Sequence, residues 1–275
     1  MALSKRQRAK AFRGVQYGLL VIAIIVIALV ADWGKVQRAF FDPEVAVKLF
    51  PTIIVDSLRN TIVYSALGFV FGLALGLVLA LMKLSSVAPY RWIATVYIEF
   101  FRGVPALLVF IAFGYGVPIA FQVRFDNLTT VMLALGIVAA AYMAETIRAG
   151  IQAVPKGQIE AARSLGMSSA RAMITVVIPQ AFRIILPPLT NELIMLTKDS
   201  SLIYVIGLAI DERELTQFGR QAMNEYRGMT PIMIAGLCYL IITLPLGHLS
   251  RRLEKRTGGR KISSSPEASG VGASA

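Results

Sequence analysis

The chain has 275 residues, of which 56% are hydrophobic, and its mean hydropathy is +0.66. Soluble domains contain about 45–50% apolar residues and do not gather them into runs of 18 or more, so this composition excludes a soluble protein. The net charge of +12 does not indicate nucleic-acid binding, because no basic stripe is interleaved with aromatic residues. A basic membrane protein usually owes its charge to cytoplasmic loops.

A retained membrane helix is expected over residues 16–34, after a basic cytoplasmic tail over residues 1–15. The apolar run 17–30 and its flanks extend about 27 Å as a helix, which is enough to cross a bilayer. A cleaved signal peptide is the alternative, since it also has a basic start and a short apolar core. The sequence Leu29-Val30-Ala31 lacks the usual small residue two positions before the last, which favours retention.

The second span is expected over residues 58–82, and it opens a membrane domain over residues 51–250. Before this domain, Asp42-Pro43 predicts the start of a short interfacial helix, because proline suits the first helical position. Within the span, small residues recur at four-residue spacing, which lets another helix backbone approach closely. These residues are Gly68, Gly72, Gly76 and Ala80.

Four further apolar segments complete an all-α, polytopic fold with about six membrane helices. They are expected over residues 104–121, 131–147, 187–207 and 231–249. A polar connection is predicted over residues 83–102, and Pro105 opens the third span. Pro187-Pro188 permits a fresh helix start for the fifth span. Residues 251–275 are expected to form a basic and then disordered cytoplasmic tail.

The distribution of basic residues predicts the orientation of the chain. Most of the 28 Lys and Arg residues fall in the two tails, in the connection 83–102 and in the segment between the fourth and fifth spans. Basic residues concentrate on the cytoplasmic side of membrane proteins. Both termini are therefore expected in the cytoplasm.

The segment between the fourth and fifth spans is too polar to face lipid and is predicted to fold as a cytoplasmic helix pair. Pro155 can open the first helix, and Gly166 suits the left-handed position just past its end. Ser168 is a plausible N-cap for the second helix, which Pro179 would limit.

The core of this segment contains Glu160-Ala161-Ala162, then Gly166, then Val176-x-Ile178-Pro179. This pattern resembles the coupling-loop signature of ABC importer permeases, with Val and Ile in place of the usual Ile and Leu. The resemblance implies a docking surface for an ABC ATPase subunit. Its residues would be Glu160, Ala161, Ala162, Gly166, Ile178 and Pro179.

Three further motifs resemble the subfamily that carries polar amino acids (His, Arg, Glu and Gln). They are Tyr97-Ile98-Glu99-Phe100-Phe101-Arg102-Gly103-Val104-Pro105, Ala144-Glu145-x-x-Arg148-Ala149-Gly150-Ile151 and Lys198-Asp199-Ser200-Ser201-Leu202. The likeness covers roughly residues 51–249, and Val104 stands where the subfamily more often has Thr. It implies a bacterial plasma-membrane complex of two permeases, identical or related, two ATPases and an extracytoplasmic solute-binding protein. The likeness alone leans toward glutamate or glutamine as cargo.

No Gly-x-x-x-x-Gly-Lys-Ser/Thr sequence occurs in the chain, so it has no phosphate-binding loop of its own. We therefore expect a transporter subunit that is not an enzyme and binds no cofactor, with ATP and Mg on the partner ATPase. The single Cys238 and the single His248 provide neither an intrachain disulfide nor a metal cluster. An ion-coupled secondary transporter is an alternative, although inverted repeats are not evident. A membrane anchor subunit is another, but it would not need five further spans.

Three charged residues and one amide of the fifth span are candidates for the substrate pathway, because an unpaired charge at membrane depth costs at least about 2 kcal/mol. These candidates are Asn191, Glu192, Lys198 and Asp199. The alternative is that Lys198 and Asp199 pair with other helices. Two pairs at i,i+3 spacing are predicted to be local ion pairs: Glu99 with Arg102, and Glu145 with Arg148.

Overall fold

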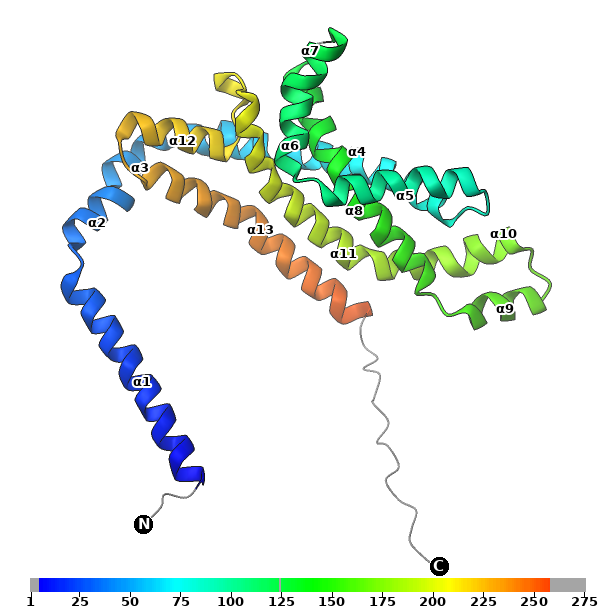
Figure 1. Cartoon of the computed structure of the whole chain (residues 1–275), viewed down its shortest axis with the longest axis horizontal. Coiled ribbons are helices and arrows are strands. Elements are labelled where there is room, and N and C mark those ends of the chain that lie inside the picture. Colours follow the sequence, from blue (N-terminus) through cyan, green and yellow to red (C-terminus); the bar gives the residue numbers. More distant parts are fainter. Residues whose placement is uncertain (1–4, 124, 258–275) are drawn as a thin grey trace, which may run out of the picture. The chain divides into compact units, whose positions relative to one another are not determined.

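The computed structural model describes residues 5–123 and 125–257, and within them it contains helices and no strand (Figure 1). The α-helices are α1 Lys5–Val30, α2 Trp33–Phe40, α3 Pro43–Leu49, α4 Arg59–Leu84, α5 Ala88–Gly103, α6 Ala106–Ile111, α7 Val117–Phe121, α8 Asn127–Gln152, α9 Lys156–Ser164, α10 Ser169–Ala172, α11 Ile178–Asp199, α12 Leu215–Tyr226 and α13 Thr230–Thr257. The π-helical segments are η1 Ile53–Leu58, η2 Ala112–Gly116 and η3 Met173–Val177. Two 3₁₀ segments are η4 Ser200–Ile206 and η5 Ile210–Glu212.

Five helical segments are long and apolar enough to cross a membrane, and a bent pair brings the number to six. The five are Phe12–Val30, Ile53–Leu84, Asn127–Gln152, Ser169–Ile206 and Thr230–Arg256, and the bent pair is Ala88–Gly103 with Ala106–Phe121. The predicted all-α, six-span architecture is thus confirmed.

Helices α4 and α8 pack closely along the predicted stripe of small residues. All four members of the stripe are buried: Gly68, Gly72, Gly76 and Ala80. A Cβ atom added to Gly72 would lie 3.1 Å from the Cβ of Ala139 and 3.1 Å from the carbonyl oxygen of Gly136. The missing side chains therefore set the short distance between the two helices, as predicted for such a stripe.

Residues 83–102 are not the polar connection that the sequence predicted. Most of them form helix α5, whose Ala94 and Ile98 are fully buried in the core. These buried positions are four residues apart, so the polar residues lie on the other faces of an amphipathic helix. α5 and the helical segment Ala106–Phe121 meet at an angle of 104°, and Pro105 explains the break because it disfavours helix in the residue before it.

Helix α11 runs through its prolines, contrary to two predictions. Pro179 does not end a helix, because it lies in the first turn of α11, where backbone N–H groups have no partner inside the helix. Pro187 and Pro188 lie inside α11 and do not start a new helix. Neighbouring helices can satisfy the backbone groups that proline frees in a membrane protein. Beside the two prolines, the Ser250 hydroxyl of α13 also donates a hydrogen bond of 3.4 Å to the carbonyl of Pro187, which joins α13 to α11.

The chain divides into two compact units. The smaller unit combines residues up to Phe50 with Gly219–Ile234, and the larger unit holds the remainder. In the smaller unit, the N–H of Asp42 donates to the Thr230 hydroxyl (3.0 Å), and the Asp42 side chain caps α3, as predicted for Asp42-Pro43. All residues of the candidate sites lie in the larger unit.

The predicted tails extend beyond the described residues. Residues 1–4 and 258–275 lie outside the described part of the chain, so the predicted disordered end is not tested there. Helix α1 already begins at Lys5, within the predicted tail 1–15, and α13 continues to Thr257.

Candidate functional site

The predicted coupling segment folds as two helices that project together from the larger unit (Figure 1). α9 begins directly after Pro155 and follows α8, whereas α10 leads through η3 into α11. Gly166 lies in the turn with φ +84°, the left-handed conformation predicted for it, and the Ser168 hydroxyl accepts from the N–H of Arg171 (3.3 Å). The predicted caps of both helices are therefore confirmed.

Most residues of the coupling signature are exposed, on α9, in the turn after it and in the first turn of α11. Ala162 is buried and fixes α9 against its neighbours. The other five signature residues are exposed: Glu160, Ala161, Gly166, Ile178 and Pro179. On α9 and its turn, the small residues Ala161 and Gly166 beside the carboxylate of Glu160 allow close approach of another protein. The use of this surface for ATPase docking stays a prediction.

A cavity of about 350 Å³ lies between α6, α8 and α11. Most of its wall is apolar, with the polar groups concentrated on α11 and at Tyr142 of α8. Its lining residues are Val104, Ala106, Phe110, Leu135, Val138, Ala139, Tyr142, Glu192, Met195, Leu196 and Asp199. A largely apolar cavity with a few convergent polar groups is the usual form of a small-molecule site.

Two of the four pathway candidates line this cavity and two do not. Glu192 and Asp199 lie seven residues apart on one face of α11, and both carboxylates reach the cavity wall. Asn191 and Lys198 are exposed and are not among its lining residues. Within the described residues, neither Lys198 nor Asp199 forms the predicted ion pair with another helix.

Arg102 has a different partner from the one predicted. The described residues contain no Glu99–Arg102 ion pair. Instead, the guanidinium of Arg102 lies over the ring of Tyr142, 5.6 Å from its centroid. Since Tyr142 lines the cavity, this cation–π contact holds a positive charge beside the cavity. Sequence spacing did not reveal it, because the two residues lie on different helices.

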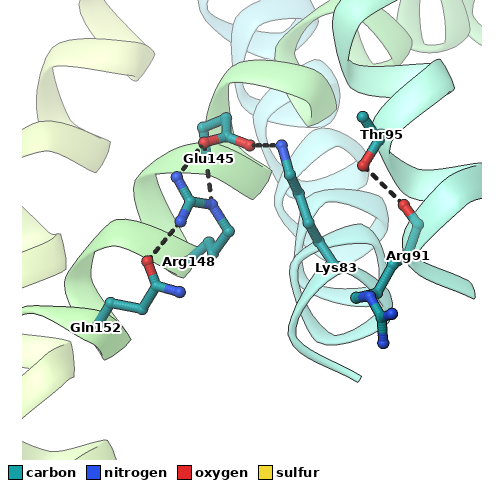
Figure 2. A network of polar contacts seen from close by, with 6 residues as sticks. All are labelled: Lys83, Arg91, Thr95, Glu145, Arg148 and Gln152. Atoms are coloured by element: carbon teal, nitrogen blue, oxygen red, sulfur yellow. Dashed lines mark hydrogen bonds and ion pairs between the residues drawn. The ribbon is translucent and has the colours of Figure 1, made fainter. Parts of the chain in front are cut away.

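The predicted pair of Glu145 and Arg148 is confirmed, and it belongs to a larger network (Figure 2). The Arg148 guanidinium donates to Oε2 of Glu145 at 2.6 Å and 3.1 Å. The ammonium of Lys83 donates to Oε1 of the same carboxylate. Lys83 lies on α4, so the network joins two helices.

The larger unit also contains a buried carboxylate, Glu214, that the sequence analysis did not single out. Glu214 is fully buried and caps α12, accepting from the N–H groups of Thr216 and Gln217 at 2.6 Å each. The Tyr239 hydroxyl also donates to it (2.7 Å). Burial raises the pKa of Glu214 to about 7, although these hydrogen bonds lower it. We assign Glu214 a structural role, because all its contacts fix α12 and α13.

Comparison with known proteins gives a consistent family assignment. Residues 72–259 match the family described as "Binding-protein-dependent transport system inner membrane component". The arginine transport system permease protein ArtQ of Bacillus subtilis (strain 168) is 38% identical over 203 residues, which cover 74% of this chain and 91% of ArtQ. The glutamate/aspartate import permease protein GltK of Escherichia coli O157:H7 is 35% identical over 224 residues, which cover 79% of this chain and 98% of GltK.

A solved structure shows the same fold at similar sequence identity. It is described as an amino acid ABC transporter with histidines, is 40% identical and superposes with a TM-score of 0.69. The superposition covers 77% of this chain and 96% of that one. The sequence match, the fold and the projecting helix pair all agree with the coupling signature. The chain therefore belongs to the binding-protein-dependent transport system inner membrane components.

Proposed function

We propose that this chain is the permease subunit of an ATP-driven amino acid importer, and that its cargo is a cationic polar amino acid. The observation that carries the choice of cargo is the pair of carboxylates in the cavity, Glu192 and Asp199. None of the described residues that line the cavity is Lys or Arg. Two negative groups without a basic partner in the wall favour a positively charged ligand.

The position of these two carboxylates at membrane depth also favours a positively charged ligand. Neither Glu192 nor Asp199 forms an ion pair within residues 5–123 and 125–257. Each unpaired charge in a membrane-spanning segment costs at least about 2 kcal/mol, so water or a bound cation must compensate it. The ammonium and side-chain cation of a basic amino acid supply two such charges at once.

Arg102 is placed to bind the third charged group of such a cargo, its α-carboxylate. Its guanidinium lies over Tyr142 at the cavity, and a planar guanidinium suits bidentate binding of a carboxylate. The α-carboxylate of the cargo would then face Arg102, while its positive groups face α11. Acidic cargo would place extra negative charge against Glu192 and Asp199.

The names of the relatives support this proposal in part. ArtQ is named for arginine, and the solved relative is described with histidines. GltK is named for glutamate and aspartate, which agrees with the expectation from the sequence motifs that the cargo is glutamate or glutamine. We favour the cationic cargo because the charge of the cavity belongs to this chain itself.

We further propose that ATP and Mg bind partner ATPases that dock on the exposed face of α9. ATP binding would move α9, and the helices around the cavity would open it to one side of the membrane and then to the other. A second permease, identical or related, and an extracytoplasmic binding protein would complete the complex. Both chain ends would lie in the cytoplasm, as the distribution of Lys and Arg predicts.

Charge reversal at the docking surface tests the ATPase partner. We expect Glu160→Lys to reduce recovery of the ATPase with the tagged permease, because it reverses the charge of an exposed contact residue. Membrane insertion should be unchanged. The matched control is Glu225→Lys, which reverses an exposed charge on α12. Full ATPase recovery with Glu160→Lys would contradict the coupling role proposed for this surface.

Thermal shift with added amino acids tests the choice of cargo on the purified permease–ATPase complex without binding protein. A ligand that binds only the folded state raises the melting temperature. We expect arginine or lysine at millimolar concentration to do so and glutamate not to, at matched ionic strength. The double variant Glu192→Gln/Asp199→Asn should lose the shift. A shift with glutamate that survives in this variant would contradict a cationic cargo.

A further inference from the structure

The last turns of α8 connect the cavity to the coupling helix by a short stretch of chain. Tyr142 lines the cavity, Glu145 follows one turn later, and α8 ends at Gln152. Only three residues separate α8 from α9. The backbone is held there too, because the N–H of Ala153 donates to the carbonyl of Ala149 (2.9 Å) and Val154 is buried. Any displacement of α9 therefore acts directly on this end of α8.

This end of α8 is tied to α4 by one ion pair. Figure 2 shows the carboxylate of Glu145 between the Lys83 ammonium of α4 and the Arg148 guanidinium of α8. The three side chains are only 18–27% exposed, so solvent screens the charges less than in a surface pair. Arg148 also donates to the Gln152 side chain, which carries the network to the last residue of α8.

The Lys83–Glu145 ion pair is not the only contact that holds this part of the molecule, because backbone packing and a hydrogen-bonded turn lie close to it. Two turns earlier, Gly76 of α4 packs against α8, where an added Cβ would lie 3.0 Å from the Ala140 carbonyl oxygen. Two turns further along α4, the ion pair of Lys83 with Glu145 provides a polar contact between the two helices. On the α4 side, Arg91 donates to the carbonyls of Ser85 (3.0 Å) and Ser86 (2.6 Å) and so closes the turn into α5.

We infer that Glu145 is a positioning residue, which holds α8 to α4 through Lys83 so that movement of α9 displaces α8, which lines the cavity, together with α4. The inference rests on the proposed function. Glu145 touches no cargo and contributes only to the efficiency of coupling. If Lys83 did not bind Glu145, α9 would still move with the ATPase. The end of α8 would then bend and would not shift together with α4.

Two variants distinguish the Lys83–Glu145 ion pair, which joins α4 to α8, from the Glu145–Arg148 ion pair within α8. Lys83→Gln removes the link to α4 and leaves the Glu145–Arg148 pair intact, whereas Arg148→Gln does the reverse. In proteoliposomes that hold the complete importer, we measure both uptake and ATP hydrolysis. We expect Lys83→Gln to lower the amino acids moved per ATP hydrolysed by roughly threefold to tenfold, as for loss of a coupling contact, and Arg148→Gln to lower it less. Lys83→Arg should restore the wild-type ratio.

A covalent cross-link between positions 83 and 145 tests whether a permanent connection of α4 and α8 is compatible with transport. In a Cys238→Ala background, which removes the single native cysteine, Lys83→Cys and Glu145→Cys can be joined by a short thiol-reactive cross-linker. Recovery of the ratio on cross-linking supports a rigid lock. Loss of all uptake on cross-linking overturns it, because the contact would then have to open in each cycle. An unchanged ratio in Lys83→Gln overturns it as well. If the wild-type complex shows no ATP-driven uptake at all, the proposed function fails instead.

Discussion

ATP-driven uptake is expected to fall by about tenfold or more when Glu192 is replaced by Gln, which corresponds to at least about 1.4 kcal/mol of lost binding or transition-state energy. The carboxylate lines the cavity and has no ion-pair partner among the described residues, so its charge is available to the cargo. Charge-assisted hydrogen bonds are roughly twice as strong as neutral ones, and Gln keeps the shape without the charge. Asp199→Asn should act in the same direction.

Basal ATP hydrolysis separates a pathway role from a structural one. We expect Glu192→Gln to leave it near the wild-type rate, because the exposed face of α9 is untouched. Asn191→Ala is the matched control: Asn191 neighbours Glu192 on α11 but is exposed and does not line the cavity. Normal uptake by a Glu192→Gln complex that has lost thermal stability would show that the carboxylate is structural and that the pathway assignment is wrong.

The largest effect on stability is expected from Gly72→Leu. A Cβ at this position would already lie 3.1 Å from both the Cβ of Ala139 and the carbonyl oxygen of Gly136, and a leucine adds three more carbons. Overpacking typically costs about 1–3 kcal/mol, and here the obstacle includes backbone, which cannot rotate away. For a protein of this size we expect the melting temperature in detergent to fall by roughly 5 °C or more.

The same substitution on an open face provides the control. Gly236 lies on α13, and an added Cβ there would meet nothing within 4 Å. Gly236→Leu has the same change in helix propensity and hydrophobicity, so it should leave the melting temperature nearly unchanged. Equal stability of the two variants would mean that the α4–α8 contact is looser than the buried stripe indicates.

Local sequence signals predicted the parts of the fold that depend on local physics. A run of about 20 apolar residues specifies a membrane helix by itself, because its length matches the bilayer. Gly166 and Ser168 were placed correctly, since a left-handed turn and a helix N-cap each depend on one residue and its neighbours. The stripe from Gly68 to Ala80 was likewise recognised as a packing face, although its partner helix was not.

The wrong predictions of helix boundaries have two physical causes. Pro179 was expected to end a helix and Pro187 to begin one, as in soluble proteins, but Pro179 lies in the first turn of α11 and α11 continues through Pro187. A membrane helix keeps its path past proline because lipid provides no alternative partner for the backbone and neighbouring helices do. Residues 83–102 were taken as a connection because they carry charges, whereas the buried Ala94 and Ile98 reveal an amphipathic helix.

The sequence by itself determined that the chain is a helical membrane permease with a polar helix pair that carries the coupling signature, because hydrophobic length and a contiguous signature are both local properties. The tertiary structure decided which charges meet. Lys83 reaches Glu145 across 62 positions of sequence, and Arg102 stacks on Tyr142 of another helix. On α11, Glu192 and Asp199 line the cavity, whereas Asn191 and Lys198 do not. Such pairings depend on how helices rotate and pack against one another, and no single segment contains that information.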